Sequence, residues 1–205
     1  MRSVAAVLVT ILLVSSACAG SGGSPTQLAT SVASPGETLS PANCPGGFCH
    51  FDTGIMTFDY PSSWRAATFN VVSSFSNDLV YLSTAPLSDP CDRGPSSVSC
   101  SRLAATALGT DGVLVTWTAW GFPGWSFDPN EGSALSVGKR EATLVTQAAE
   151  NGCQKIGGVR EIIVKIPREA ESNWMQLDAC LAGSDPTVAQ SQVEAMLKTV
   201  RWTSQ

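Results

Sequence analysis

The chain has 205 residues, of which 43% are apolar and 14% charged, which is enough for one globular domain with a sizeable core and a targeting segment. Its formal net charge is −5, and the part from Cys18 onward carries 11 basic against 17 acidic residues, a net charge of −6, because Arg2 is the only charged residue before Cys18. This acidic balance excludes nucleic acid as an expected partner.

The N-terminus predicts a signal peptide over residues 1–17. A single positive charge at Arg2 precedes an apolar run over residues 4–14, and small residues follow at 15–17. This order of charge, apolar core and small residues is typical of secretory leaders, which are removed from the mature protein. We therefore exclude these residues from the fold.

The end of this leader, Val14-Ser15-Ser16-Ala17-Cys18, resembles the lipobox of bacterial lipoproteins. The resemblance implies that Cys18 takes a diacylglyceryl group and becomes the new N-terminus. Ser15 departs from the pattern, which usually has Leu there, and Ala17-Cys18-Ala19 also fits ordinary signal peptidase cleavage. We predict lipid anchoring at Cys18 on the outer face of the cell membrane, with plain secretion as the alternative.

Residues 18–43 predict a disordered tether. They are rich in Gly, Ser, Thr, Pro and Ala, with one charge at Glu37. Such a segment buries too little apolar surface to offset its ordering entropy, and about 25 flexible residues reach on the order of 30 Å. Residues 44–205 then form a single globular domain. No later apolar run approaches the roughly 18 to 20 residues needed to cross a bilayer, so Cys18 is the expected membrane contact.

The cysteines predict disulfides. Six remain once Cys18 is set aside, and an even number in an exported chain implies three bridges. Fifteen pairings are possible, and proximity favours the local ones. We predict the pairs Cys44 with Cys49, Cys91 with Cys100, and Cys153 with Cys180. The chain has one histidine, His50, and no paired C-x-x-C motifs, so we predict neither a metal site nor a cofactor.

Strand-like segments follow through the middle of the chain. Residues 48–60 alternate imperfectly and stop at Pro61, which predicts one strand that ends in a turn. Residues 140–148 fit a strand or a helix, and their β-branched residues favour a strand. Further strand-like runs lie at about 67–73, 79–84 and 112–119, with loops at 86–100 and 109–112.

The strongest pattern is a predicted hairpin of residues 159–166 and 174–181, whose apolar side chains alternate with a period of two. The polar residues 168–172 provide the turn. If the turn centres near residue 170, Cys180 lies opposite residues 159–160, where a bridge to Cys153 would clamp the open end.

A helix is predicted over residues 186–199. Asp185 and Pro186 supply the N-cap and the first-turn proline, and apolar residues recur at helical spacing after them. Trp202 then leaves the helix as an aromatic residue expected to fold back on the domain.

Both ends of the domain resemble PsbP/Mog1-like domains. The segment 57–64 (TFDYPSSW) resembles their opening strand and turn, and 196–202 (MLKTVRW) resembles their closing helix and strand. The resemblance covers roughly residues 46–203. It implies an α+β fold, an antiparallel sheet flanked by helices in an α/β/α sandwich, here stapled by disulfides. The fold is common among exported bacterial lipoproteins, including an actinobacterial type, and offers no catalytic residues to carry over.

We predict no catalytic residues. The chain has no G-x-S-x-G elbow, and its single histidine, His50, adjoins Cys49 in a short loop. Residues 128–132 offer oxygen ligands for calcium, but they lack the third ligand position and distal Glu of a calcium loop, so we interpret them as a turn.

An aromatic segment over residues 117–127 holds five of the fifteen aromatic residues. Trp117 fits the strand alternation and is predicted to be core. The other four straddle Gly and Pro and are candidate ligand-binding residues: Trp120, Phe122, Trp125 and Phe127. Two interpretations stay open: the rings contact an apolar or sugar-like ligand or a protein partner, or they cap the end of a sheet.

These features favour a lipid-anchored accessory or binding protein of the cell envelope, without catalytic activity. The alternative is an exported hydrolase whose site is assembled from scattered carboxylates. Convergent titratable groups in a pocket would favour the hydrolase, and an apolar patch or groove would favour the binding protein.

Overall fold

The computed structural model describes residues 38–39, 44–100, 103–168 and 173–203. The predicted signal peptide and the predicted tether, including Cys18, lie outside the described residues except for residues 38–39. Thr38 and Leu39, which fall within the predicted tether, form strand β1 and pair with Ala67 and Ala66.

The domain consists mainly of strands, which hold 49% of the described residues against 13% in helices. The strands after β1 are β2 (Phe48–Asp52), β3 (Met56–Pro61), β4 (Arg65–Ala67), β5 (Val71–Val72), β6 (Ser76–Ser83), β7 (Cys91–Arg93), β8 (Val98–Cys100), β9 (Val113–Gly121), β10 (Ser133–Val137), β11 (Arg140–Ala148), β12 (Gly158–Pro167), β13 (Asn173–Ala182) and β14 (Arg201–Trp202). The helices are a 3-10 turn at Pro45–Gly47, α1 (Asn151–Lys155) and α2 (Thr187–Thr199).

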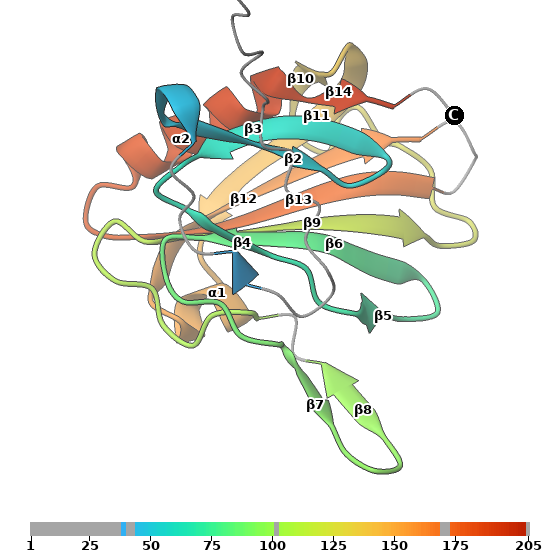
Figure 1. Cartoon of the computed structure of the whole chain (residues 1–205). Coiled ribbons are helices and arrows are strands. Elements are labelled where there is room, and N and C mark those ends of the chain that lie inside the picture. The colour runs from blue at the N-terminus through green and yellow to red at the C-terminus, as the bar shows by residue number, and fades with distance from the viewer. Residues whose placement is uncertain (1–37, 40–43, 101–102, 169–172, 204–205) are drawn as a thin grey trace, which may run out of the picture.

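Nine strands form one antiparallel sheet in the order β1-β4-β6-β9-β13-β12-β11-β10, with β5 paired to β6. A second sheet, β14-β3-β2, lies with α2 on one face of the large sheet, while the short α1 lies on the other (Figure 1). Strands β7 and β8 form a separate hairpin that projects from the body.

The predicted α+β sandwich with helices on the faces of its sheet is therefore wrong. Residues 48–60, predicted to be one strand, form two, β2 and β3, and this hairpin supplies much of the layer that the prediction gave to helices. A tight turn divides the two strands: the Asp52 carboxylate accepts the Gly54 N–H at 2.7 Å, and Gly54 has φ +81°, a left-handed conformation that glycine adopts without strain.

The two segments that resemble PsbP/Mog1-like domains meet in this small sheet. Arg201 and Trp202, which follow α2, pair with Thr57 and Met56 of β3. The layers around these two segments differ from the sandwich that the resemblance implies.

The hairpin of β12 and β13 is confirmed, one residue longer at each end than predicted. Cys180 lies opposite Glu161, about one residue from the expected position, and the register runs without interruption from the Pro167–Trp174 pair to the Arg160–Leu181 pair. The irregularity between Gly158 and Arg160 lies beyond Cys180. The predicted turn at 168–172 lies outside the described residues except for Arg168. Strands at 112–119 and 140–148 are confirmed as β9 and β11.

All three predicted disulfides are present, with S–S distances of 2.02 to 2.04 Å. Three disulfides indicate an oxidising, extracytoplasmic environment. Cys91 and Cys100 face each other across β7 and β8, so the segment 86–100, predicted to be a loop, contains a short stapled hairpin. Among the described residues, no helix is long and apolar enough to cross a membrane.

The main hydrophobic core lies between the two sheets and α2. Each fully buried large side chain contributes roughly 1.5 to 3 kcal/mol. The largest of these side chains are Trp64, Trp117, Tyr60, Phe51, Phe58, Met56, Leu82, Ile162, Ile166, Met175 and Leu177. The predicted burial of Trp117 is therefore confirmed. A second, smaller core lies on the other face of the large sheet around the Cys153–Cys180 bridge.

Helix α2 is confirmed within one residue of its predicted start. The Asp185 carboxylate accepts hydrogen bonds from the Thr187 hydroxyl at 2.5 Å and the Thr187 N–H at 3.1 Å. These two bonds hold the pKa of Asp185 below its ordinary value. After the helix, Trp202 folds back as expected, and its indole N–H donates to the Val137 carbonyl at 3.1 Å.

Candidate functional site

A bulge in β6 turns a carboxylate toward the face of the large sheet opposite the main core. The pairing register shifts between Asp78 and Val80, so that Asp78 and Tyr81 lie on this face while Val80 belongs to the main core. Asp78 is 3% exposed. The Tyr81 hydroxyl donates to one carboxylate oxygen at 2.5 Å, and the Thr118 hydroxyl donates to the other at 2.8 Å. The carboxylate is thus buried but has hydrogen bonds at both oxygens.

Strand β13 carries a chain of hydrogen bonds on the same face. The Trp174 indole N–H donates to the Gln176 side-chain carbonyl at 3.1 Å, and the Gln176 amide donates to both Asp178 oxygens at 2.8 and 3.0 Å. Because alternate residues of a strand face the same side, these three side chains form one row. The row holds the Asp178 carboxylate in place with a neutral donor.

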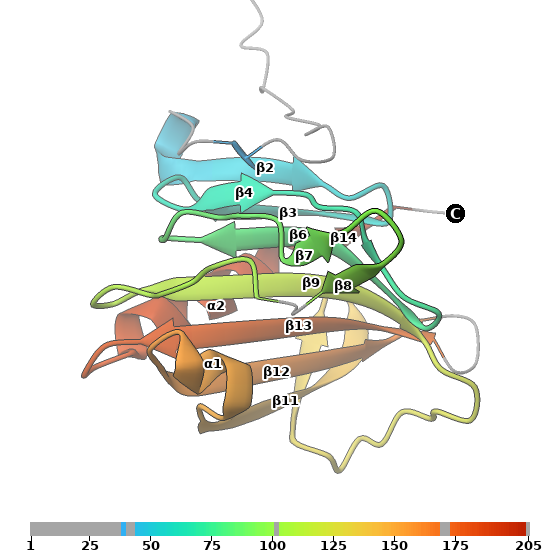
Figure 2. The same ribbon diagram turned by 90° about the horizontal axis from the view of Figure 1, so that it is seen from below.

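Asp78, Thr118 and Asp178 line a pocket of about 290 Å³, which we call the carboxylate pocket. Its base comes from β6, β9 and β13, and α1 lies over one end of β12 and β13 in the view onto this face (Figure 2). Four acidic residues line it and none of the described lining residues is basic; the acids are Asp78, Glu150, Glu161 and Asp178. Thr116 and Thr118 add hydroxyl groups.

A third carboxylate in the pocket is also held by a neutral group. The Gln147 amide on β11 donates to Glu161 on β12 at 3.1 Å. Hydrogen bonds of this kind orient the acceptor oxygens without neutralising their charge. The pocket therefore offers fixed acceptors for the hydroxyl or amino groups of a ligand. In the part of the chain that the structure describes, no group of three or more His, Cys, Asp or Glu side chains is arranged to hold a metal ion.

The four predicted aromatic residues do not form one surface. Trp120 and Trp125 are half-buried and both stack on Trp174, with ring centroids 5.4 and 4.3 Å apart. Phe122 is 49% exposed and meets Phe75 edge to face at 4.9 Å. The remaining residue, Phe127, is half-buried. The structure thus groups two of the predicted rings in a tryptophan stack and gives a third a different aromatic neighbour.

Sequence reasoning missed Trp174 and the carboxylates as site residues. The available signal was the alternation of β13, where Gln176 and Asp178 stand between the buried Met175, Leu177 and Ala179. Polar residues at alternate positions on a central strand indicate a sheet face that is not fully covered by apolar layers. That signal identifies the face, but the partners on neighbouring strands require the strand order.

Two other candidates have structural explanations. His50 Nδ1 lies 2.8 Å from Asp59 on the neighbouring strand of the small sheet, away from the carboxylate pocket. Asp128 accepts hydrogen bonds from the backbone N–H and the side-chain amide of Asn130 at 2.8 and 3.2 Å, which is the pattern of an Asx turn.

No protein-family model matches this chain, and no curated protein matches it. The functional argument therefore rests on the geometry of the pocket and of the tryptophan stack.

Proposed function

We propose that the chain is an exported, lipid-anchored accessory or binding protein of the cell envelope, without catalytic activity, whose ligand is hydroxyl-rich and sugar-like. The observation that carries this proposal is the carboxylate pocket, where Asp78, Glu161 and Asp178 are each held by neutral donors on the same strand or on a neighbouring one. A ligand hydroxyl donates well to such a fixed carboxylate, and the desolvated surroundings strengthen the bond.

The tryptophan stack supports the same ligand class. Trp174 connects to the pocket through Gln176 and Asp178, so that an aromatic surface lies next to oriented acceptors on one sheet face. Sites for small ligands combine apolar or aromatic walls with a few placed polar groups. We propose Trp120 and Trp125, which both stack on Trp174, as the aromatic side of this ligand surface.

Asp178→Asn tests the pocket. Replacing the carboxylate with an amide keeps the shape and removes a charged acceptor, a change of roughly 1.5 to 3 kcal/mol for a bond to a charged group. We expect at least a tenfold weaker affinity for the best binder among neutral trisaccharides such as cellotriose, chitotriose and maltotriose, measured by NMR titration. Glu141→Gln, an exposed change on β11, is the matched control and should bind like the wild type.

The proposal fails if none of these trisaccharides shifts the amide signals of Thr116 and Thr118 in the wild type. It also fails if Asp178→Asn binds as well as the control.

A hydrolase with scattered carboxylates is the second candidate, because the pocket brings together acids from β6, β12, β13 and the residue before α1. In the same titration samples we expect the trisaccharides to stay intact. Cleavage that disappears in Asp78→Asn would favour the hydrolase instead.

Lipid anchoring is tested by Cys18→Ala. The described domain begins beyond this residue, so the variant should appear in the medium with an unchanged circular dichroism spectrum and melting temperature. The wild type should stay with the membrane, because two or more acyl chains give stable attachment. Retention of the variant on membranes would count against the anchor.

A further inference from the structure

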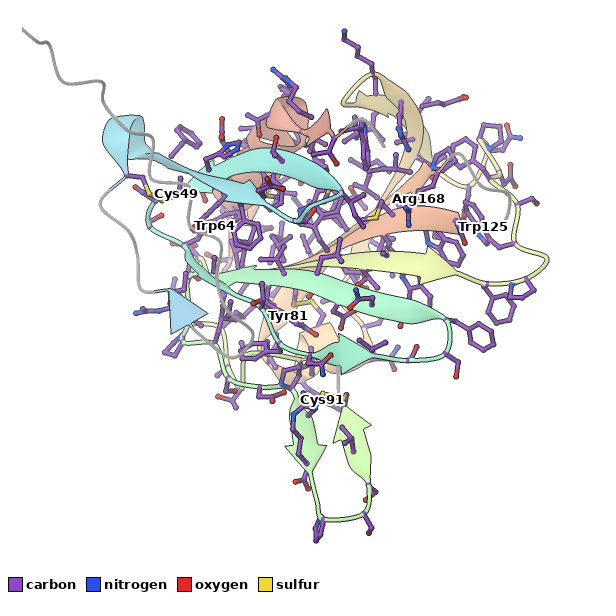
Figure 3. The ribbon with its side chains drawn as sticks, turned by 45° about the vertical axis from the view of Figure 1, so that its right-hand side comes forward. Cys49, Trp64, Tyr81, Cys91, Trp125 and Arg168 are labelled. Atoms are coloured by element: carbon purple, nitrogen blue, oxygen red, sulfur yellow. A yellow bond between two sulfur atoms is a disulfide. The ribbon has the colours of Figure 1, made fainter. Side chains whose placement is uncertain are left out.

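A second recess lies at the end of the large sheet, where β6 and β13 begin and β9 ends. Its volume is about 280 Å³, and it is lined at this end by Arg168, which follows β12. Figure 3 shows Arg168 and Trp125 at this end of the sheet. We call the recess the Arg168 groove; the lining residues used below are Phe75, Asn77, Trp120, Gly121, Arg168 and Asn173.

Arg168 is a half-buried cation that has no side-chain partner within the described part of the chain. Its side chain forms no hydrogen bond or ion pair with any described residue, whereas Arg160 donates to Gln190 at 2.8 Å and Lys165 forms an ion pair with Glu131. Removing a guanidinium from water is unfavourable unless its donors are satisfied. None of the described residues that line the groove carries a carboxylate.

The groove has room for a ligand because residue 121 is a glycine; a larger side chain at this position would fill part of it. A Cβ on Gly121 would lie 2.7 Å from the side-chain oxygen of Asn173. The Gly121 N–H donates to the Phe75 carbonyl at 2.9 Å, and the Arg168 N–H donates to the Asn173 carbonyl at 2.9 Å. These bonds bring Arg168, Asn173 and Phe75 together around the Arg168 groove.

We propose that the Arg168 groove binds the carboxylate of a small sugar acid. A guanidinium recognises a carboxylate through two parallel hydrogen bonds, and the amides of Asn77 and Asn173 suit ring hydroxyls. Phe75, which is 44% exposed, offers an aromatic face. The groove is slightly smaller than sites for drug-sized ligands, which favours a ligand of one ring. The chain's net charge of −5 disfavours polyanions, which favours a single carboxylate.

The groove shares no lining residue with the carboxylate pocket, although Trp120 belongs to both the groove and the tryptophan stack. NMR titration of the mature protein distinguishes the two sites. Sodium glucuronate should shift the amide signals of Gly121 and Asn173 and leave those of Thr116 and Thr118 unchanged. Glucose at the same concentration should leave Gly121 and Asn173 unchanged, because it lacks the charged group. An equal response to glucose, or a stronger one to inorganic phosphate, would overturn the assignment of a carboxylate ligand.

Arg168→Gln should weaken glucuronate binding at least tenfold, and Arg168→Lys should weaken it less, since it keeps the charge but loses the two-pronged geometry. Lys198→Gln, on the exposed last turn of α2, removes the same charge elsewhere and should bind like the wild type. Unchanged binding in Arg168→Gln, or no response of the wild type to glucuronate, would overturn the proposal. The dispersed amide spectra of both Arg168 variants report that each is folded.

Discussion

Gly158→Ala is expected to lower the free energy of unfolding by about 3 kcal/mol, the upper part of the usual range for overpacking a core. A Cβ at this position would lie 2.3 Å from the sulfur atoms of both Cys153 and Cys180, and 2.8 Å from the Cys153 carbonyl oxygen. Gly158 is buried at the start of β12, directly beneath the bridge. The sulfur atoms are bonded to each other and anchored on two elements, so neither can move aside alone.

The double variant Cys153→Ala/Cys180→Ala provides the test background. Loss of this bridge, which joins residues 27 positions apart, should by itself lower the free energy of unfolding by about 3.5 kcal/mol in the chain-entropy model. Without the sulfur atoms, adding Gly158→Ala should cost less than about 1 kcal/mol more, because one backbone contact remains. Urea denaturation of all four proteins measures the difference.

Gly109→Ala is the control. A Cβ there would meet nothing within 4 Å, and the residue has no left-handed φ, so the change should be neutral or stabilise the protein by up to about 1 kcal/mol. If Gly158→Ala lowers stability equally with and without the bridge, the close approach to the sulfur atoms is not the cause.

The elements that sequence could predict are those fixed by local spacing. The hairpin of β12 and β13, the three disulfides and α2 each depend on residues close together in the chain, and all are confirmed. Periodicity reports which side chains share a face, and cysteines near in sequence close small loops at little entropic cost. Neither depends on knowing the rest of the fold.

The layers could not be predicted because they depend on how distant segments pair. The hairpin of β2 and β3 contacts α2 and β14 from the opposite end of the chain, and the Asp59 N–H donates to the Thr199 hydroxyl 140 residues away. A resemblance in short end motifs does not specify what covers the sheet between them. The layer assigned to helices was therefore the part of the prediction most open to error.

The carboxylate pocket could not be predicted from the sequence pattern because β6 contains a bulge. A strict period of two places Asp78 on the same face as Val80 and Leu82, which are core residues, and the irregularity after Asp78 reverses this. A shift of one residue turns every later side chain to the other face. The tryptophan stack could not be predicted either, because Trp120 meets Trp174 only if β9 lies next to β13, and the sequence pattern does not give the strand order.

Trp174→Ala is expected to lower the free energy of unfolding by about 3 to 5 kcal/mol, as for other large buried aromatic residues. Trp174 is 7% exposed and stacks with both Trp120 and Trp125. Trp125→Ala removes one stacked pair from a half-buried position, so we expect a loss nearer to 1 kcal/mol. Thermal and urea unfolding of the two variants separate the supporting ring from the proposed ligand-binding ring.

Trp174→Phe adds a test of the connection to the pocket. It keeps an aromatic ring in the stack but removes the indole N–H that donates to Gln176, so Gln176 loses one of the bonds that fix its orientation toward Asp178. We therefore expect a smaller loss of stability than in Trp174→Ala, together with weaker trisaccharide binding.

A loss of 3 to 5 kcal/mol in Trp125→Ala, the range for buried aromatic residues, would instead make that ring a cap of the sheet end and remove it from the ligand surface.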